Sequence, residues 1–310
     1  MDKKVKLQEG YVRPEDSSFS KGTNRIVTGA FLLMSFVVFL PILLVFIVSF
    51  SSEQSVTAVG YSFFPQSLST EAYRYLFRSG SYITRAFFNS LFITAAGTLL
   101  GLALMCPMAY ALSRREFRYG KQLLVFLMIP MLFSGGLVSS YMVNTQILHL
   151  KNDYLSLILP GLCSTWYILI LRNYFRTAVP ESLTEAAKLD GCRHLQIFGY
   201  VVLPVAKPAV MTVMIFQMFA YWNSWYPSLL YLDSNHTELY PLQYVLVNME
   251  RSIEAITKDA QYMSGMQAVN PPSMTIRMAM VVVVILPVMV LFPFFRKFLK
   301  TGMTVGAVKG

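Results

Sequence analysis

One segment of the chain has residue types and a spacing that could do specific work: EAAKLDGCRHLQIFGYVVLP, from Glu185 to Pro204. Pro180 can occupy the start of a helix, because its missing N–H would be unpaired there anyway. Glu181 and Glu185 follow, and negative charge is favourable in a first turn. Gly191 can adopt the left-handed conformation that ends a helix. The pattern predicts a short charged helix, a turn and a second short helix, which together suit docking better than catalysis.

The predicted helices should each have an apolar face. The first has a mainly small apolar stripe at helical spacing, made of Leu183, Ala186, Ala187 and Asp190. The second is expected to bury Leu195, Phe198, Val201 and Val202. A helix lying on lipid is the alternative, but two alanines in place of large apolar residues would bind a membrane weakly. We therefore expect a protein partner for this segment.

A second group of residues has the chemistry of a sugar-binding surface, with aromatic faces for the ring and amides for its hydroxyls. Its members are Gln217, Tyr221, Trp222, Asn223 and Trp225. Polar side chains inside a membrane span tend to face the bundle interior or a cavity. Trp and Tyr also collect at the membrane interface, so Trp225 and Tyr226 fit an aromatic belt equally well. The group is predicted to line a substrate path.

Enzymatic and nucleic-acid functions find no support in the residues. His149, His194 and His236 lie on different segments without the spacing of a zinc site. No Gly-rich loop ends in Gly-Lys-Ser/Thr, so ATP would have to be hydrolysed by a partner. We expect no catalytic residue, no metal and no cofactor on this chain.

Long apolar runs determine the fold. The chain is 55% hydrophobic and only 14% charged, whereas soluble domains are about a quarter charged. A membrane-spanning helix needs about 20 mostly apolar residues, and backbone groups in lipid must be satisfied internally. The sequence thus predicts an all-α, multi-pass membrane protein with six transmembrane helices. These are expected at Ile26–Phe50, Ala86–Leu112, Leu123–Ile147, Leu155–Leu171, Ala209–Leu232 and Ile276–Phe298.

The net charge of +10 reflects topology, because the basic residues are concentrated on one side of the predicted spans. They precede the first span, fill 114–121 and 172–207, and close the chain. By the positive-inside rule this side is cytoplasmic, with both termini and the Glu185 segment. The connection of some forty residues at 233–275 then faces outward, and it is too long for a simple connector. No nucleic-acid partner is expected.

The Glu185 segment resembles the EAA loop of the inner-membrane permeases of ABC importers, in particular the maltose-type carbohydrate group. The matching residues are Glu185, Ala186, Ala187, Asp190, Gly191, Phe198, Val201, Leu203 and Pro204. The resemblance implies a coupling helix that sits in a cleft of an ATPase subunit, with Glu185 pairing to a basic residue there and Gly191 making the turn. Cys192 stands where the family often has Ala.

Two further segments carry the resemblance. The end KTGMTVGAVKG looks like the tail of a permease subunit that reaches the ATPase, with Gly302, Gly306, Lys309 and Gly310 at the matching positions. A short Gly-rich end is also often simply flexible. The segments YWNSWYPSLLYL and LYPLQYVL resemble the subgroup associated with oligosaccharides released from polysaccharides.

The resemblance implies a permease domain at 25–300, with its coupling loop at 180–204, between cytoplasmic tails at 1–24 and 301–310. In a bacterial cell membrane it would pair with a second permease, two ATPase subunits that bind ATP and Mg, and an extracytoplasmic binding protein. The solute is expected to be an oligosaccharide. A permease for another solute, a channel or secondary carrier, and a membrane scaffold are the alternatives; the spans lack the isolated carboxylates typical of ion-coupled carriers.

Overall fold

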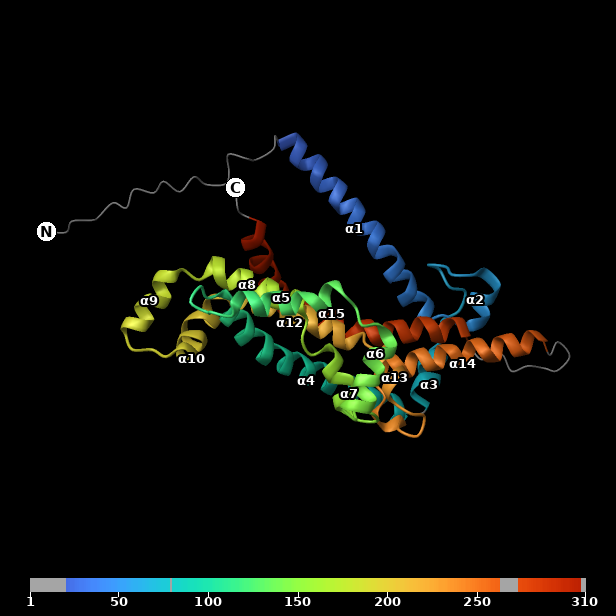
Figure 1. Cartoon of the computed structure of the whole chain (residues 1–310). Coiled ribbons are helices and arrows are strands. Elements are labelled where there is room, and N and C mark those ends of the chain that lie inside the picture. The colour runs from blue at the N-terminus through green and yellow to red at the C-terminus, as the bar shows by residue number, and fades with distance from the viewer. Residues whose placement is uncertain (1–20, 79, 263–272, 308–310) are drawn as a thin grey trace.

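The computed structural model describes residues 21–78, 80–262 and 273–307 (Figure 1). Within these ranges the chain is helical, and its only extended pairing is an isolated bridge between Ser51 and Leu68. This confirms the predicted all-α fold. Lys309 and Gly310, two of the predicted tail residues, lie outside the described residues, as does most of the predicted N-terminal tail.

Three of the predicted spans are single long helices: α1 (Lys21–Ser49), α4 (Gly80–Ser113) and α15 (Ser273–Ala307). In the described part of the chain these are the helices that are long and apolar enough to cross a membrane unaided. Both α1 and α15 extend into segments expected to be tails. Gly302 and Gly306 are consequently helical.

The span predicted at 123–147 is a bent pair of helices. It consists of α5 (Gly120–Leu132), α6 (Gly136–Met142) and the π-helical segment η2 (Val143–Ile147). The two halves meet at 116°. Gly136 lies at the corner with φ +79°, a conformation that a residue without a Cβ adopts at little cost.

Two other predicted spans are also broken. The fourth comprises α7 (Tyr154–Ile158), a 3₁₀ turn η3 (Leu159–Gly161) and α8 (Thr165–Ala178), with a 51° bend. In the fifth, α12 (Lys207–Trp222) ends well before Leu232, and the short α13 (Tyr226–Tyr231) follows. A bent segment at His194–Val205 joins α12 at 82°. If each bent pair forms one span, the described chain has up to six.

Helix α4 runs through the middle of the bundle, where it packs against α8 and α12, while α15 packs against α12 and α1. In Figure 1, α1 leans away from the other helices and approaches them at its C-terminal end, near α2. Most of its large apolar side chains are exposed, including Phe31, Phe36 and Phe39. Lipid or another subunit must therefore cover most of α1.

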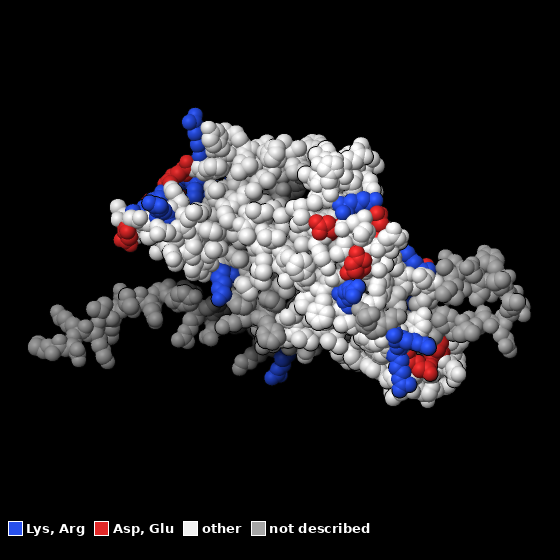
Figure 2. Space-filling view, turned by 90° about the horizontal axis from the view of Figure 1, so that it is seen from below, with Lys and Arg blue, Asp and Glu red and all other residues white. Residues whose placement is uncertain are grey.

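Charged side chains gather toward the two ends of the molecule. Figure 2 shows Lys, Arg, Asp and Glu at both ends, with a mostly uncharged surface between them. Such a belt suits the apolar interior of a bilayer, where charged side chains are costly.

Short helices close the end of the bundle remote from the Glu185 segment. They are α2 (Glu53–Val59), α3 (Glu71–Arg78) and η5 (Thr237–Leu239), together with the longer α14 (Leu242–Tyr262). The last two confirm that the 233–275 connection forms structure of its own. Asn89 of α4 fixes this connection by donating to the carbonyls of Glu238 at 2.7 Å and Tyr240 at 3.1 Å.

Candidate coupling loop and translocation path

Backbone geometry defines the ends of the predicted coupling helix, α9 (Glu181–Leu189), which begins after Pro180 as expected. At its other end the N–H of Cys192 donates to the carbonyl of Ala187, and the N–H of Gly191 donates to that of Lys188, each at 3.0 Å. This pair of bonds is the Schellman motif, which requires a left-handed residue. Gly191 fills that place with φ +83°, so the predicted turn is confirmed.

Helix α9 presents Glu185 outward. Thr184 and Ala187 are buried against the bundle, whereas Leu183, Glu185 and Ala186 are exposed. The Glu185 carboxylate forms no hydrogen bond or ion pair with the described residues. One side of α9 therefore holds the helix in place, and the Glu185–Ala186 edge is open to a partner.

After the turn, the chain forms α10 (His194–Ile197), the π-helical η4 (Phe198–Val202) and α11 (Leu203–Val205). Ile197 and Val202 are buried, and Phe198 packs on Tyr110 with ring centroids 5.2 Å apart. The expectation that Leu195 is buried is wrong, since it is 79% exposed. Among the other predicted loop residues, Leu203 is half-buried, and Asp190, Gly191 and Pro204 are exposed.

Large apolar side chains surround the outer edge of this loop, and their exposure was not predicted. Leu189 is 90% exposed and Tyr200 is 80% exposed, which adds to the exposed Leu195. The sequence did offer a signal for this exposure, since Leu189 and Leu195 stand among charged and polar residues. Exposed apolar side chains grouped near a charged helix are typical of a protein interface.

The loop that follows α4 anchors α9 through two ion pairs. Lys188 Nζ donates to both carboxylate oxygens of Glu116, at 2.6 and 2.8 Å, and Arg115 lies 3.3 Å from Glu181. The hydrogen bond from Lys188, followed by its positive charge, lowers the pKa of Glu116. Exposed ion pairs contribute little to stability individually. Their value here is positional, because they tie both ends of α9 to the loop that follows α4, which is far away in the sequence.

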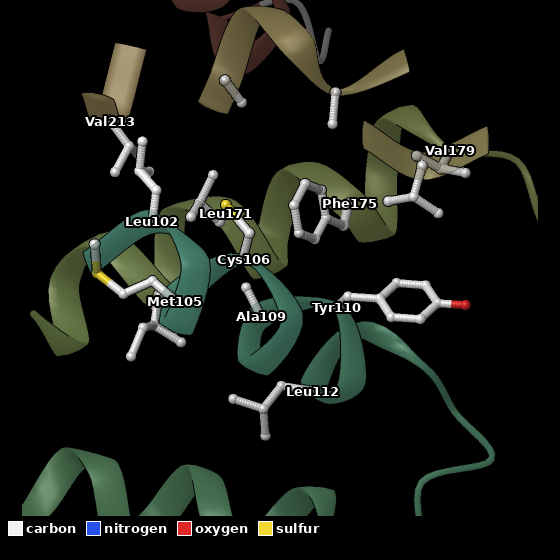
Figure 3. Packing of buried hydrophobic residues seen from close by; sticks show 14 of the residues in the cluster. Leu102, Met105, Cys106, Ala109, Tyr110, Leu112, Leu171, Phe175, Val179 and Val213 are labelled. Carbon is white, nitrogen blue, oxygen red and sulfur yellow. The ribbon is translucent and has the colours of Figure 1, made fainter. Parts of the chain in front are cut away.

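A packed core supports this end of α4 and α8 (Figure 3). Leu171 and Phe175 of α8 are fully buried with Met105 and Ala109 of α4. The Nε of Arg172 donates to the carbonyl of Leu112 at 3.0 Å. Displacement of α9 would thus be transmitted to two membrane helices, because close-packed interiors transmit strain.

Three residues of the predicted substrate path are buried and bonded to backbone carbonyls. Gln217 Nε2 donates to Gly161 at 2.7 Å, and Tyr221 OH donates to Ile158 at 2.7 Å. Trp222 Nε1 donates to Val284 at 3.2 Å. Gln217 and Tyr221 thereby satisfy carbonyls at the break between α7 and α8, and Trp222 joins α12 to α15. These contacts position helices, which the sequence pattern did not indicate.

Two glycines of α4 make room for these side chains. A Cβ at Gly97 would lie 2.4 Å from the ring of Tyr221, and one at Gly101 would lie 2.6 Å from the carbonyl oxygen of Leu162. The Gly-x-x-x-Gly spacing is the signal that could have identified this close contact, since small residues four apart allow membrane helices to approach closely.

The remaining two path residues reach the surface. Asn223 is exposed where α12 ends, and its Oδ1 accepts from Gln243 Nε2 at 3.2 Å. Trp225 is half-buried, with the guanidinium of Arg251 5.5 Å from its ring centroid. The structure thus divides the predicted group into a buried part with a packing role and an accessible part beside α14.

No family model matches the chain, but similar proteins are found by sequence and by structure. It is 37% identical over 288 residues to the polygalacturonan/rhamnogalacturonan transport system permease protein YtcP of Bacillus subtilis, covering 92% of this chain and 97% of that protein. It is 27% identical to the arabinooligosaccharides transport system permease protein AraQ of the same organism, covering 90% and 94%.

A solved structure resembles the whole fold. A chain of a bacterial ABC transporter involved in the import of the acidic polysaccharide alginate matches with a TM-score of 0.76 and 26% identity. The match covers 91% of this chain and 100% of that one. The chain therefore belongs to the family of carbohydrate ABC transporter permeases.

Proposed function

We propose that this chain is a transmembrane subunit of an ATP-driven importer that moves an oligosaccharide into the cell. The observation that carries the proposal is α9: a helix anchored on its inner side, with Glu185 unpaired among the described residues at its open edge. Such an edge suits a basic residue on an ATPase subunit. The named substrates of the similar transporters are carbohydrates, and these support the choice of solute.

The proposed assembly contains a second permease chain, two ATPase subunits that bind ATP and Mg, and an extracytoplasmic binding protein. The poorly covered α1 and the apolar faces of α5 and α6, which contain no buried residue, offer surfaces for the second permease. Both termini face the cytoplasm, on the same side as α9. ATP-driven closure of the ATPases moves α9, and the core beneath it transmits that motion to α4 and α8.

The C-terminal segment is a second contact in this proposal. Gly302 and Gly306 lie in the last turns of α15, on the side assigned to the cytoplasm, and the proposed contact with an ATPase subunit consists of these two residues with Lys309 and Gly310. Removal of residues 308–310 should weaken ATPase retention without preventing insertion of the chain. Full retention would remove this contact from the proposal.

The decisive test is co-purification in detergent with candidate partner proteins, comparing wild type with Glu185→Lys. Wild type should retain an ATPase and a second permease, and the variant should lose the ATPase while keeping the permease. Glu71→Lys is a matched control, because it makes the same charge change at an exposed residue of α3, at the other end of the molecule. A wild-type chain that purifies alone would favour a secondary carrier.

A further inference from the structure

Helices α14 and α15 lie side by side (Figure 1), and between them is an open cavity of about 280 Å³. Gln243, Val247 and Glu250 of α14 line one wall, and Arg277 and Met280 of α15 line the other. The cavity thus combines a carboxamide, a carboxylate and a guanidinium with apolar surface. Polar and ionisable residues in a membrane domain usually face a cavity or pathway rather than lipid.

Arg277 is incompletely paired in this cavity. Its Nε is buried and has no hydrogen-bond partner among the described residues. Its Nη2 lies 3.9 Å from Glu254, which is too far for a hydrogen bond. Buried N–H groups are nearly always bonded, so an unbonded one needs an explanation. A guanidinium has a planar fork of donors that matches a carboxylate.

A second arginine, Arg251, belongs to α14, the helix that forms one wall of the cavity. Arg251 is exposed, packs over the ring of Trp225 and forms no ion pair with the described residues. Packing on an aromatic face restrains a guanidinium while leaving donors at its edge. Trp225 is in turn close along the chain to Asn223, which bonds Gln243 at the cavity. Residues four apart on a helix are neighbours, so Arg251 lies one turn of α14 beyond Val247 of the cavity wall.

The charges in and around the cavity narrow the chemistry of its ligand. Arg251 and Arg277 are balanced by Glu250 and Glu254, so a densely charged anion would be repelled by the two carboxylates. A neutral sugar could bond these groups through its hydroxyls, but it offers no carboxylate to match the planar fork of donors on Arg277. A ligand with hydroxyl donors, one carboxylate per ring and apolar ring faces satisfies every group.

We propose that the α14–α15 cavity binds a uronic acid residue of the transported oligosaccharide, with its carboxylate held by Arg277 and Arg251. Glu250 and Gln243 accept and donate hydrogen bonds to the ring hydroxyls, and Trp225 lies at the edge of the site. The inference rests on the proposed function and adds the substrate class and the residues that select it.

Occupancy of the cavity can be measured directly in the assembled permease complex without the binding protein. Val247→Cys places a thiol in the wall, and its alkylation rate is followed at that position by mass spectrometry. Tri-galacturonate should slow alkylation, whereas its methyl ester, which has the same sugar and linkage but no charge, should not. In Arg277→Gln and Arg251→Gln backgrounds, the concentration of tri-galacturonate needed for protection should rise about tenfold, as expected for a lost charge-assisted hydrogen bond.

Arg74→Gln in the same background is the matched control, because it removes an exposed arginine of α3 outside the cavity; it should leave protection unchanged. Equal protection by the acid and the ester, or protection that both cavity variants retain, would overturn the inference. So would saccharide uptake by the wild-type importer without any protection at position 247, and this result would leave the proposed function intact. A wild-type complex that takes up no saccharide would instead contradict the proposed function.

Discussion

The carboxylate of Glu53 caps the start of α15 from 222 residues away in the sequence, by accepting the N–H of Thr275 at 3.0 Å. The Thr275 hydroxyl donates to the same oxygen at 2.8 Å, and the N–H of Met274 donates to the other oxygen at 3.0 Å. First-turn N–H groups have no partner within their own helix. A negative charge there also interacts favourably with the helix dipole. Glu53 therefore joins the end of the first span to the beginning of the last.

Replacement of Glu53 by alanine should destabilise the chain by about 1–2 kcal/mol, the usual cost of a lost N-cap with its charge. The measurement is the thermal unfolding midpoint of the purified complex in detergent. Glu71→Ala is the control, because Glu71 also lies in the first turn of a short helix at this end of the molecule but its carboxylate forms no hydrogen bond or ion pair with the described residues. Equal midpoints for the two variants would mean that the cap contributes nothing.

Alanine at Gly101 should destabilise the bundle by about 1–3 kcal/mol, the range for overpacking a core. The new Cβ would meet the carbonyl oxygen of Leu162 at 2.6 Å, and backbone cannot move aside as a flexible side chain can. Gly199→Ala, where no atom lies within 4 Å of the added Cβ, should be neutral in the same unfolding assay.

The Gly97 contact can be separated from the Gly101 contact by a second substitution. Gly97→Ala clashes with the Tyr221 ring at 2.4 Å, so Tyr221→Ala should remove the additional cost of Gly97→Ala. The same partner substitution should not relieve Gly101→Ala. Stability measured over the two double-mutant cycles checks this difference, and identical coupling in both cycles would contradict it.

The pair of Glu116 and Lys188 predicts a pH dependence for the anchoring of α9. The pKa of Glu116 is lowered in the folded protein from its ordinary value of 4.5 by the hydrogen bond and charge of Lys188. Its contribution is therefore fully present above the ordinary value and is lost as the pH falls through the lowered folded value. The difference in unfolding midpoint between wild type and Glu116→Gln should be constant near neutral pH and shrink below about pH 4.5.

Lys188→Met supplies the matched variant for this pair. It should show the same pH-dependent difference from wild type, and the double variant should show no further loss, because both substitutions remove one interaction. Additive effects of the two substitutions would indicate that each residue has a separate partner.

Gly191→Val should release the ATPase from the complex. Valine in the left-handed conformation costs about 1–2 kcal/mol, and the strain would disturb the turn that ends α9. Gly60 is a useful comparison, since it also has a positive φ, +79°, and no atom within 4 Å of an added Cβ. Gly60 has ψ −165°, a region that is essentially restricted to glycine, so Gly60→Val should impose at least as much strain at the opposite end of the molecule and leave ATPase retention unchanged. If both variants retain the ATPase, the turn at Gly191 is not needed for docking.

Hydropathy predicted the long helices well because α1, α4 and α15 each contain an apolar stretch long enough to cross a membrane. It could not distinguish a straight span from a bent one, since Gly136 and the Pro160–Gly161 pair are compatible with either. The bends depend on contacts between remote segments, such as the hydrogen bond from Gln217 to Gly161. A sequence pattern does not specify which carbonyl a buried amide will reach.

In the coupling loop, too, some features could be predicted from the sequence and others could not. The turn at Gly191 could be predicted, because glycine adopts the left-handed conformation at little cost. Leu195 was assigned to the wrong face, because α10 lasts a single turn before the wider π-helical η4 changes the angular spacing of the side chains. The ion pair between Glu116 and Lys188 could not be predicted from a local sequence pattern, since its partners are 72 positions apart in the chain.

The packing of α1 against α15, together with the Glu53 cap, has a consequence for how the protein is made. Helix α1 gains its most extensive helix contact only after α15, far along the chain, has been synthesised. Until then α1 rests in the bilayer with lipid as its main neighbour, which its uninterrupted apolar surface allows. The C-terminal end of α1 can meet α3 earlier, through the hydrogen bond between Ser49 and Tyr73, but a product that stops before α15 lacks the long packing surface for this helix.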